Sequence, residues 1–292
     1  MNSLLSIKDL HVSFGLGSET VDAVRGINLE IARGEIVGIV GESGSGKSAS
    51  MLSVMRLLAT TATTRGTVHF AGKELFSASS KEMREIRGGK IGMIFQDPMT
   101  SLNPSFRIGS QIAEAIIRHQ HVSTKSAVSK ATDLLEVVSI PRPSESMSLF
   151  PHEMSGGMKQ RVMIAMAIAN DPELLIADEP TTALDVTIQA QILEVLKGLR
   201  ETRNLSIVII THDLGVVAGL ADSVNVMYAG EIVESGDVEG VFYNSTHPYS
   251  RGLLSCVPRL DIRESALHPI GGDPPKLSEK TPGCSFQPRC KN

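Results

Sequence analysis

A glycine-rich loop at residues 41–48, with the sequence G-E-S-G-S-G-K-S, constrains the fold of this chain more than any other stretch. An apolar, strand-like run at residues 35–40 precedes the loop, and a run suited to a helix at residues 49–58 follows it. Glycines let backbone N–H groups approach an anion closely, and the start of a helix directs further N–H groups and the positive end of its dipole to the same place. This strand–loop–helix context predicts a nucleoside triphosphate site and disfavours a surface loop that only fits the pattern.

The residues of this stretch expected to contact the nucleotide are Gly41, Ser43, Gly44, Ser45, Gly46, Lys47, Ser48 and Ala49. Lys47 can reach the β- and γ-phosphates, and the hydroxyl of Ser48 can bind Mg²⁺. Phe14 ends a predicted strand at residues 4–15, where its ring can stack on the base or serve as an ordinary core aromatic.

The composition fits a soluble globular protein in a reducing compartment. Hydrophobic residues make up 41% of the chain and charged residues 21%, and three cysteines are too few to suggest a disulfide framework. The net charge of −4 argues against a broad nucleic-acid-binding face, so nucleic acid is not an expected partner. The N-terminus lacks the basic and apolar regions of a signal peptide, and no apolar run approaches the roughly 20 residues of a membrane-spanning helix.

Strand-like and helical segments alternate along most of the chain. Strands are expected at residues 4–15, 22–31, 35–40, 66–70, 90–96, 174–179, 206–211 and 224–228, and helices at residues 49–58, 108–119, 127–138, 156–170 and 188–200. The alternation predicts an α/β fold with a mostly parallel sheet covered on both faces. Residues 97–152, which open on a turn cluster at 98–104, predict a helical subdomain inserted into this core, and the composition from about residue 241 predicts a tail of irregular structure.

The predicted strand at residues 174–179 is apolar and ends in two carboxylates, Asp178 and Glu179. Open α/β sheets bind ligands at the carboxyl ends of their strands. Asp178 can hold Mg²⁺ through its water shell, whereas Glu179, on the other face by strand alternation, is placed to act as a general base on an attacking water. Acidic turns of this kind are common on surfaces. The glycine-rich loop at residues 41–48, called the phosphate loop from here on, lies upstream and favours a catalytic pair.

A second helix N-terminus suited to phosphate begins at Ser155, Gly156 and Gly157. The chain therefore has two such ends, although one nucleotide needs only one. A head-to-tail dimer would use both helix ends, because each nucleotide would lie between the loop of one subunit and residues 155–157 of the other.

Three further features accompany these motifs: Gln96, the A-L-D string at residues 183–185, and His212. The motifs then stand in the order found in the ATP-binding-cassette (ABC) family, and residues 14–212 resemble that family. The resemblance implies a P-loop NTPase fold with an antiparallel β subdomain, an inserted helical subdomain, and ATP with Mg²⁺ as ligands. The resemblance implies that Phe14 stacks on the adenine and that Gln96 senses Mg²⁺ and water. It implies that Ser155, Gly156 and Gly157 bind the γ-phosphate of the partner's nucleotide and that Asp185 links the two sites. It also implies that His212 contacts the γ-phosphate and positions Glu179. By itself His212 could also be a capping or core histidine. In this family the motif that starts at Ser155, Gly156 and Gly157 is called the signature. The next position is Met158 here and usually glutamine in the family, and we expect phosphate binding to survive this change.

Several strings are similar to one branch of that family, the ATPase subunits of dipeptide and oligopeptide importers, which also serves nickel, glutathione and opines. They lie at residues 94–104, 176–186, 211–217, 247–254 and 283–290. The branch implies an ATPase core at residues 1–96 and 153–240, a helical subdomain at 97–152 and a C-terminal extension at 241–292. It also implies a peripheral location at the cytoplasmic face of the cell membrane. The implied partners are a second ABC ATPase (a paralogue or a second copy), two transmembrane permeases and a periplasmic or extracellular solute-binding protein.

In that branch the cysteines of the tail recur as a four-thiolate cluster that can hold a [4Fe–4S] centre. Cys284 and Cys290 match its first two positions, and the sequence stops at Asn292. Because such a cluster needs four cysteines, we expect one only if further cysteines follow residue 292. The pair is otherwise vestigial, or two ordinary thiols in a loop.

The leading hypothesis is the ATP-hydrolysing subunit of an ABC importer, and the alternative is a soluble ABC ATPase acting on nucleic acid or ribosomes. Chromosome-organising members carry a long coiled coil between the phosphate loop and the signature, for which residues 49–154 leave no room. Translation-type members usually fuse two cassettes, and this chain has one. The motif at residues 155–157 and the lack of N-K-x-D argue against an unrelated P-loop kinase or GTPase. The sequence does not identify the cargo, because solute selectivity lies in the binding protein and the permeases.

Overall fold

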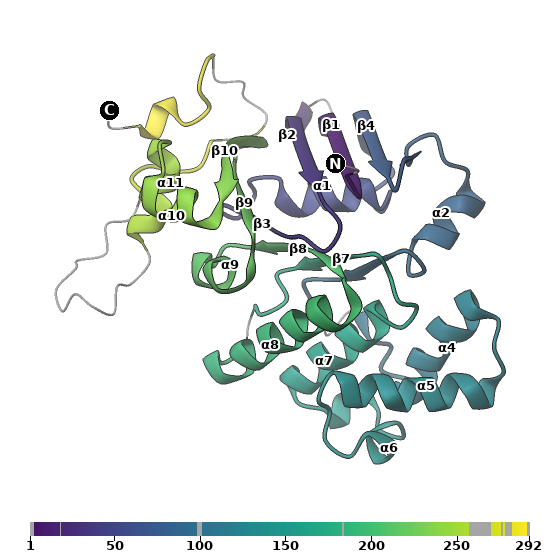
Figure 1. Cartoon of the computed structure of the whole chain (residues 1–292). Coiled ribbons are helices and arrows are strands. Elements are labelled where there is room, and N and C mark those ends of the chain that lie inside the picture. Colours follow the sequence, from purple (N-terminus) through teal and green to yellow (C-terminus); the bar gives the residue numbers. More distant parts are fainter. Residues whose placement is uncertain are drawn as a thin grey trace. The chain divides into compact units, whose positions relative to one another are not determined.

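The computed structural model describes residues 3–17, 19–97, 101–182, 184–256, 270–275, 277 and 282–290, and it divides into two compact units (Figure 1). The first unit comprises residues 1–78 and 209–292, and the second comprises residues 79–208. The expected boundaries of the helical subdomain at residues 97–152 and of the C-terminal extension at 241–292 stay a prediction.

An antiparallel sheet in the first unit has the strand order β2-β1-β4-β5. Its strands are β1 (Leu5–Leu16), β2 (Glu19–Ile31), β4 (Ala62–Phe70) and β5 (Lys73–Glu74). Alternate side chains of β1, such as Leu5 and Ile7, are fully buried, as the period-2 pattern predicts. The register shifts after Ile7, where Asp9 has a positive φ, and the antiparallel β subdomain expected from the family resemblance is present.

The phosphate loop follows a second, mostly buried group of strands in the first unit. Strand β3 (Ile36–Val40) pairs in parallel with β9 (Ser223–Tyr228), which pairs antiparallel with β10 (Glu231–Asp237). Helix α1 (Lys47–Val54) begins directly after the loop. Helix α9 (Leu214–Leu220) packs so closely that a Cβ at Gly38 would lie 2.6 Å from Val217 Cγ1. A glycine in β3 is therefore what lets this helix approach the strand.

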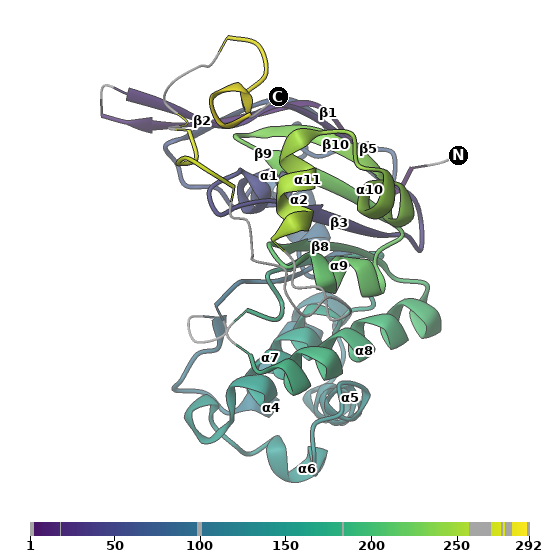
Figure 2. The same ribbon diagram turned by 90° about the vertical axis from the view of Figure 1, so that its left-hand side faces the viewer.

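The C-terminal part of the first unit is more ordered than its composition suggests. Helices α10 (Val238–Asn244) and α11 (Pro248–Ser255) lie against β9 and β10 in Figures 1 and 2, and a 3-10 helix, η2, spans Gln287–Arg289. The prediction of an irregular tail from residue 241 was therefore wrong for α11 and for the end of α10. Pro248 occupies the first position of α11, where a missing N–H costs nothing, and the His247 ring caps the helix by accepting from Tyr249 N.

The second unit contains the parallel pair β6 (Ile91–Ile94) and β7 (Leu174–Asp178) and a group of helices. The helices are α2 (Ser80–Ile86), α4 (Ile108–Gln120), α5 (Thr124–Val137), α6 (Pro143–Ser146), η1 (Pro151–Glu153), α7 (Gly156–Ala167) and α8 (Val186–Arg203). Helices α4 and α5 lie side by side in Figures 1 and 2, and Ile112, Ile116 and Leu135 are fully buried, as helical periodicity predicts. The turn cluster expected at residues 98–104 lies partly outside the described residues, which omit 98–100.

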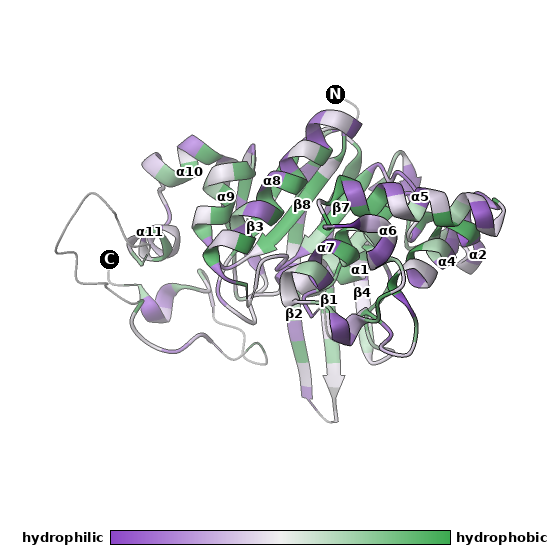
Figure 3. Cartoon of the chain, turned by 90° about the horizontal axis from the view of Figure 1, so that it is seen from below, coloured by the Kyte–Doolittle hydropathy of each residue, from purple (hydrophilic) through white to green (hydrophobic). Residues whose placement is uncertain are grey.

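Strand β8 (Ser206–Thr211), in which the chain passes from the second unit to the first, is buried at every position and mostly hydrophobic in Figure 3. All the predicted strands and helices are confirmed, with ends that differ by a few residues. Among the described residues, the elements that the sequence did not predict are α2, α6, α9, α10, α11, β5, β10 and the 3-10 helices η1 and η2. The unpredicted helices have at most eight residues, too few to show a helical period clearly.

Candidate nucleotide-binding and catalytic site

The phosphate loop is a cradle that only glycine can form at two of its positions. Gly41 has a φ of 155°, and a Cβ there would lie 2.1 Å from the carbonyl oxygen of Met227. Gly46 has a φ of 100°, and a Cβ there would lie 2.3 Å from the carbonyl oxygen of Ala23. Both walls of the cradle are thus backbone from β9 and β2, which cannot give way as a flexible side chain would.

The cradle closes around the amino group of Lys47. This side chain is 5% exposed, and its Nζ donates to the carbonyl oxygens of Gly41 at 2.8 Å and Glu42 at 2.9 Å. Gly46 is the N-cap of α1 and offers no side-chain acceptor to the first turn of the helix. An ammonium group beside a helix N-terminus without a side-chain cap is an arrangement that favours an anion.

The hydroxyl of Ser45 supports the fit of the loop to a phosphate group. Ser45 is 4% exposed, and its Oγ has no hydrogen-bond partner among the residues that the structure describes. A buried hydroxyl without a partner costs about 1–3 kcal/mol, which a phosphate oxygen within reach would offset. Ser43 and Gly44 are exposed on the same loop, and Ser48 and Ala49 are half-buried in the first turn of α1. The loop therefore fits the triphosphate expected from the sequence.

Phe14 is half-buried near the end of β1, opposite Val21 of β2 and Ala62 of β4. It is not among the buried core residues of this unit. The expected stacking on a base therefore stays a prediction.

In the second unit, Gln96 and Glu179 meet beyond the carboxyl ends of two paired parallel strands. Strand β6 ends shortly before Gln96 and β7 ends at Asp178, so strand geometry brings the next residues of each to one edge. Gln96 Nε2 donates to Glu179 Oε2 at 3.0 Å, and the hydroxyl of Thr182 donates to the same oxygen at 2.8 Å. The carboxylate is thus held by two neutral donors, while Asp178 is buried, 4% exposed.

Glu179 departs from the expected strand geometry. The strand predicted to reach Glu179 ends at Asp178, and Glu179 has a φ of 48°. Its direction is therefore set by a left-handed backbone and not by strand alternation. Such a conformation costs a non-glycine residue on the order of 1–3 kcal/mol and is found where the surrounding structure holds a functional group in place.

The signature residues combine an exposed helix end with tight packing. Ser155 is the N-cap of α7, and its Oγ accepts from Met158 N at 3.3 Å, a backbone contact that does not depend on the side chain of Met158. Gly156 is exposed, whereas a Cβ at Gly157 would lie 2.6 Å from Ile188 Cγ2 of α8. Gly157 therefore has a packing role that the sequence did not reveal.

Asp185 supports that packing, because its Oδ1 accepts from Ile188 N at 2.9 Å and caps α8. A carboxylate at an N-cap is a common helix start, so this contact was open to prediction from the sequence. The neighbouring position 183 of the expected A-L-D string lies outside the described residues.

His212 follows β8 in the first unit, and its side chain is exposed. The helix after it, α9, is capped by Asp213, whose Oδ1 accepts from Gly215 N at 2.8 Å. The sequence left open whether His212 caps a helix or lies in the core. The cap is Asp213 instead, and the exposure of His212 rules out a core position.

Comparison with known proteins decides the family. Residues 24–182 match the family described as "ABC transporter", and residues 233–292 match the "Oligopeptide/dipeptide transporter, C-terminal region". The chain belongs to the ABC transporter family. It is an ATPase of this family and of its dipeptide/oligopeptide branch, so the expected class is confirmed and the reading as a nucleic-acid or ribosome ATPase is not supported.

Relatives of this ABC ATPase match along nearly its whole length. The dipeptide transport ATP-binding protein DppD of Bacillus subtilis (strain 168) is 51% identical and covers 100% of this chain, which covers 88% of that protein. The oligopeptide transport ATP-binding protein OppD of the same organism is 52% identical over 97% of this chain and 80% of that protein. Among solved structures, a dimeric post-hydrolysis state of the ATP-binding cassette MJ0796 bound to ADP and Pi superimposes with a TM-score of 0.72 and 29% identity, over 80% of this chain and 98% of that one. These neighbours confirm the ABC ATPase fold.

The two cysteines of the ABC ATPase's tail lie in different surroundings. Cys284 is exposed, with its Sγ 3.9 Å from His247 Nε2, whereas Cys290 is half-buried against the core of the C-terminal part. Among the described residues, no group of three or more His, Cys, Asp or Glu side chains is arranged to hold a metal ion. The conditional iron–sulfur cluster therefore has no support here. Within the same residues, no helix is both long and apolar enough to span a bilayer.

Sequence reasoning missed Thr182, whose hydroxyl donates to Glu179 at the edge where β6 and β7 end. The sequence could have indicated this contact, because Thr182 carries a hydroxyl three residues after the candidate base Glu179, within reach of a tight turn. Its bond to Glu179 is as short as any at this edge.

Proposed function

We propose that this ATPase works as one of two cassettes that bind ATP between them and power the uptake of dipeptides, oligopeptides or a related small solute through partner permeases. The observation that carries the proposal is the glycine cradle of Gly41 and Gly46 closed around Lys47. The cargo class is supported by the names of the relatives, which are dipeptide and oligopeptide transport ATP-binding proteins.

Phosphate binding is proposed to start from the loop. The ammonium group of Lys47, now bonded to two loop carbonyls, exchanges them for oxygens of the β- and γ-phosphates, a stronger charge-assisted contact. Ser48, Asp178 and Gln96 are the proposed holders of Mg²⁺, directly or through water, and oxygen ligands of this kind suit that ion. Mg²⁺ held by these residues would neutralise charge on the phosphate oxygens during transfer.

Glu179 is the proposed general base. Its carboxylate takes the proton of a water as the water oxygen forms its bond to the γ-phosphorus and the bond to the β-phosphate oxygen breaks. The donors Gln96 and Thr182 both bind Oε2, which fixes the plane of the carboxyl group before the water arrives. His212 is proposed to contact the γ-phosphate and to position Glu179.

The signature residues are proposed to serve the nucleotide of the other cassette. Ser155 and Gly156 are exposed at the N-terminus of α7, where a helix end favours a phosphate, and Asp185 is proposed to link the two sites of the dimer. The similar cassette MJ0796 is a dimer in its post-hydrolysis state, which supports this arrangement. Further proposed partners are two transmembrane permeases and an extracytoplasmic solute-binding protein, with the ATPase at the cytoplasmic face of the membrane.

Purification from detergent-solubilised membranes tests this function. The full chain carrying an affinity tag should bring down two multi-spanning membrane proteins, and its ATP hydrolysis in that complex should rise when a solute-binding protein loaded with peptide is added. Recovery with ribosomes or nucleic acid in place of membrane proteins would overturn the proposal. Stimulation only by a solute unrelated to peptides would overturn the cargo class and leave the importer class standing.

A further inference from the structure

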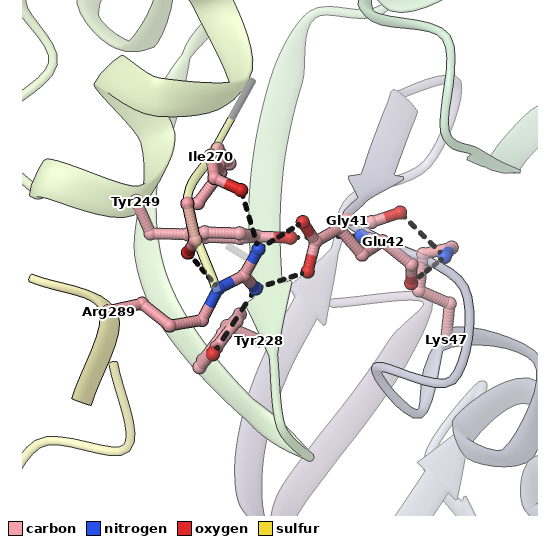
Figure 4. Close-up of polar contacts among 8 residues, drawn as sticks. Gly41, Glu42, Lys47, Tyr228, Tyr249, Ile270 and Arg289 are labelled. Carbon is pink, nitrogen blue, oxygen red and sulfur yellow. Dashed lines mark hydrogen bonds and ion pairs between the residues drawn. The ribbon is translucent and has the colours of Figure 1, made fainter. Parts of the chain in front are cut away.

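All three polar groups of Glu42, the second residue of the phosphate loop, are held by side chains. Its N–H donates to the hydroxyl of Tyr249 at 2.9 Å, and its carbonyl accepts from Lys47 Nζ at 2.9 Å. Its carboxylate accepts two bonds from Arg289, at 2.7 Å from Nη1 and 3.1 Å from Nη2 (Figure 4). Tyr249 and Arg289 lie far along the chain, in the C-terminal region. We propose that Arg289 and Tyr249 are positioning residues of the ATP site, which act through Glu42 to fix the phosphate loop and the amino group of Lys47.

The Arg289 side chain is itself firmly fixed. It is 5% exposed, its Nε donates to Gly271 O at 3.0 Å, and its Nη2 also donates to Ile270 O at 3.3 Å (Figure 4). Its guanidinium carbon lies 5.8 Å from the centre of the Tyr228 ring. The guanidinium of this two-pronged pair is buried while the Glu42 side chain is 26% exposed, and such a pair holds a more defined geometry than an exposed ion pair of two mobile side chains. Glu42 is thus tied to a fixed point.

Tyr249 is fixed by packing. It is fully buried, and its ring centre lies 4.5 Å from that of Tyr228 and 5.4 Å from that of Phe286. Burial raises the pKa of the Tyr249 hydroxyl, so the group that receives the Glu42 N–H is neutral at physiological pH. The aromatic cluster therefore places one hydroxyl at a set point beside the loop.

These contacts form a continuous path from the C-terminal region to the lysine. Arg289 and Tyr249 hold the side chain and the N–H of Glu42, and the carbonyl on the far side of the same residue holds Lys47 Nζ. Because phosphate binding depends on groups held within fractions of an ångström, freeing one side of Glu42 lowers the affinity for ATP. The inference rests on the proposed ATP site and assigns part of its precision to a segment outside the nucleotide motifs.

The first test replaces Arg289 with glutamine in the full chain and measures the KM and kcat of ATP hydrolysis, the Kd of ATP and the thermal midpoint. We expect KM and Kd to rise about tenfold, the effect of losing a charge-assisted contact, with a smaller change in kcat. Arg251→Gln is the matched control, because Arg251 is exposed in the same region and donates only to Ser245 O among the contacts found for it. An R289Q variant with a lower thermal midpoint and wild-type KM and Kd would show a role in stability alone and would overturn the inference.

A double-mutant cycle with Glu42→Gln tests whether Arg289 acts through Glu42. We expect R289Q and E42Q together to raise the Kd no more than the larger single change, because both remove the same pair. Multiplying effects would overturn the path. Tyr249→Phe keeps the ring and removes the hydroxyl, so it should raise the Kd of ATP severalfold. Tyr243→Phe, at an exposed tyrosine, is the control and should leave the Kd unchanged. If R289Q does not fold, an unchanged Kd in Y249F would overturn the inference. Lys47→Ala serves as the reference, since undiminished ATP binding in that variant would overturn the ATP site itself and not the role of Arg289.

Discussion

Replacing Thr182 with valine tests how the carboxylate of Glu179 is held. The Thr182 hydroxyl donates to Glu179 Oε2 at 2.8 Å, and Gln96 Nε2 donates to the same oxygen at 3.0 Å. Valine has nearly the shape of threonine and removes only the hydroxyl, so the variant deletes this donor and keeps the one from Gln96. Without the Thr182 hydroxyl the carboxyl group of Glu179 is held less tightly, and it can rotate away from the attacking water.

The magnitude follows from that single bond. A hydrogen bond to a charged group contributes about 1.5–3 kcal/mol, and the exposure of this edge places the loss at the lower end of that range. A loss of about 1.5 kcal/mol of transition-state stabilisation corresponds to a fall in kcat of slightly more than about tenfold. The KM for ATP should stay within about twofold, because the phosphate loop is unchanged.

Steady-state ATP hydrolysis by the full chain at saturating ATP measures this fall. Thr187→Val is the matched control, because Thr187 is exposed in the first turn of α8 and the change is the same. An unchanged kcat in T182V, or an equal fall in T187V, would refute the argument that the Thr182 hydroxyl orients the base.

Three further predictions concern the base, the signature and the C-terminal region. Glu179→Gln should keep ATP binding while hydrolysis falls by about 10²–10⁴-fold, the usual contribution of a general base, leaving an ATP-stabilised dimer detectable by gel filtration; unchanged turnover would remove Glu179 from that role. Ser155→Arg should block ATP-dependent dimerisation while the monomer still binds ATP, and a variant that still dimerises would contradict the shared site. Burial tends to raise the pKa of Glu234, but hydrogen bonds from Thr246 and Ser245 outweigh it and lower the pKa to about 2 from its ordinary value of 4.5. Because the folded pKa is the lower one, the stability from this group is complete above pH 4.5 and is lost as the pH falls towards 2, so the gap in thermal midpoint between wild type and Glu234→Gln should close over that interval; a constant gap would contradict the assignment.

The sequence alone determined those features that depend on short-range spacing. The cradle requires Gly41 and Gly46, and the two acids after an apolar strand mark the candidate catalytic site. Backbone conformation and strand period are local properties that a few neighbouring residues reveal. The order of these motifs was enough to identify the family, which the comparisons confirm. Where the sequence erred, in the C-terminal tail, prolines and serines indicated irregular chain although Pro248 starts a helix.

Only the tertiary structure decided which distant side chains are in contact. Arg289 lies 247 positions from Glu42 in the sequence, and Gln96 lies 83 positions from Glu179, yet each pair is joined by hydrogen bonds. No period or spacing reports such a pair, since it depends on how the strands and helices between the two residues close the chain upon itself. The tight contact between Gly157 and Ile188 has the same origin, because a glycine at a helix start looks alike whether it faces a phosphate or a neighbouring helix.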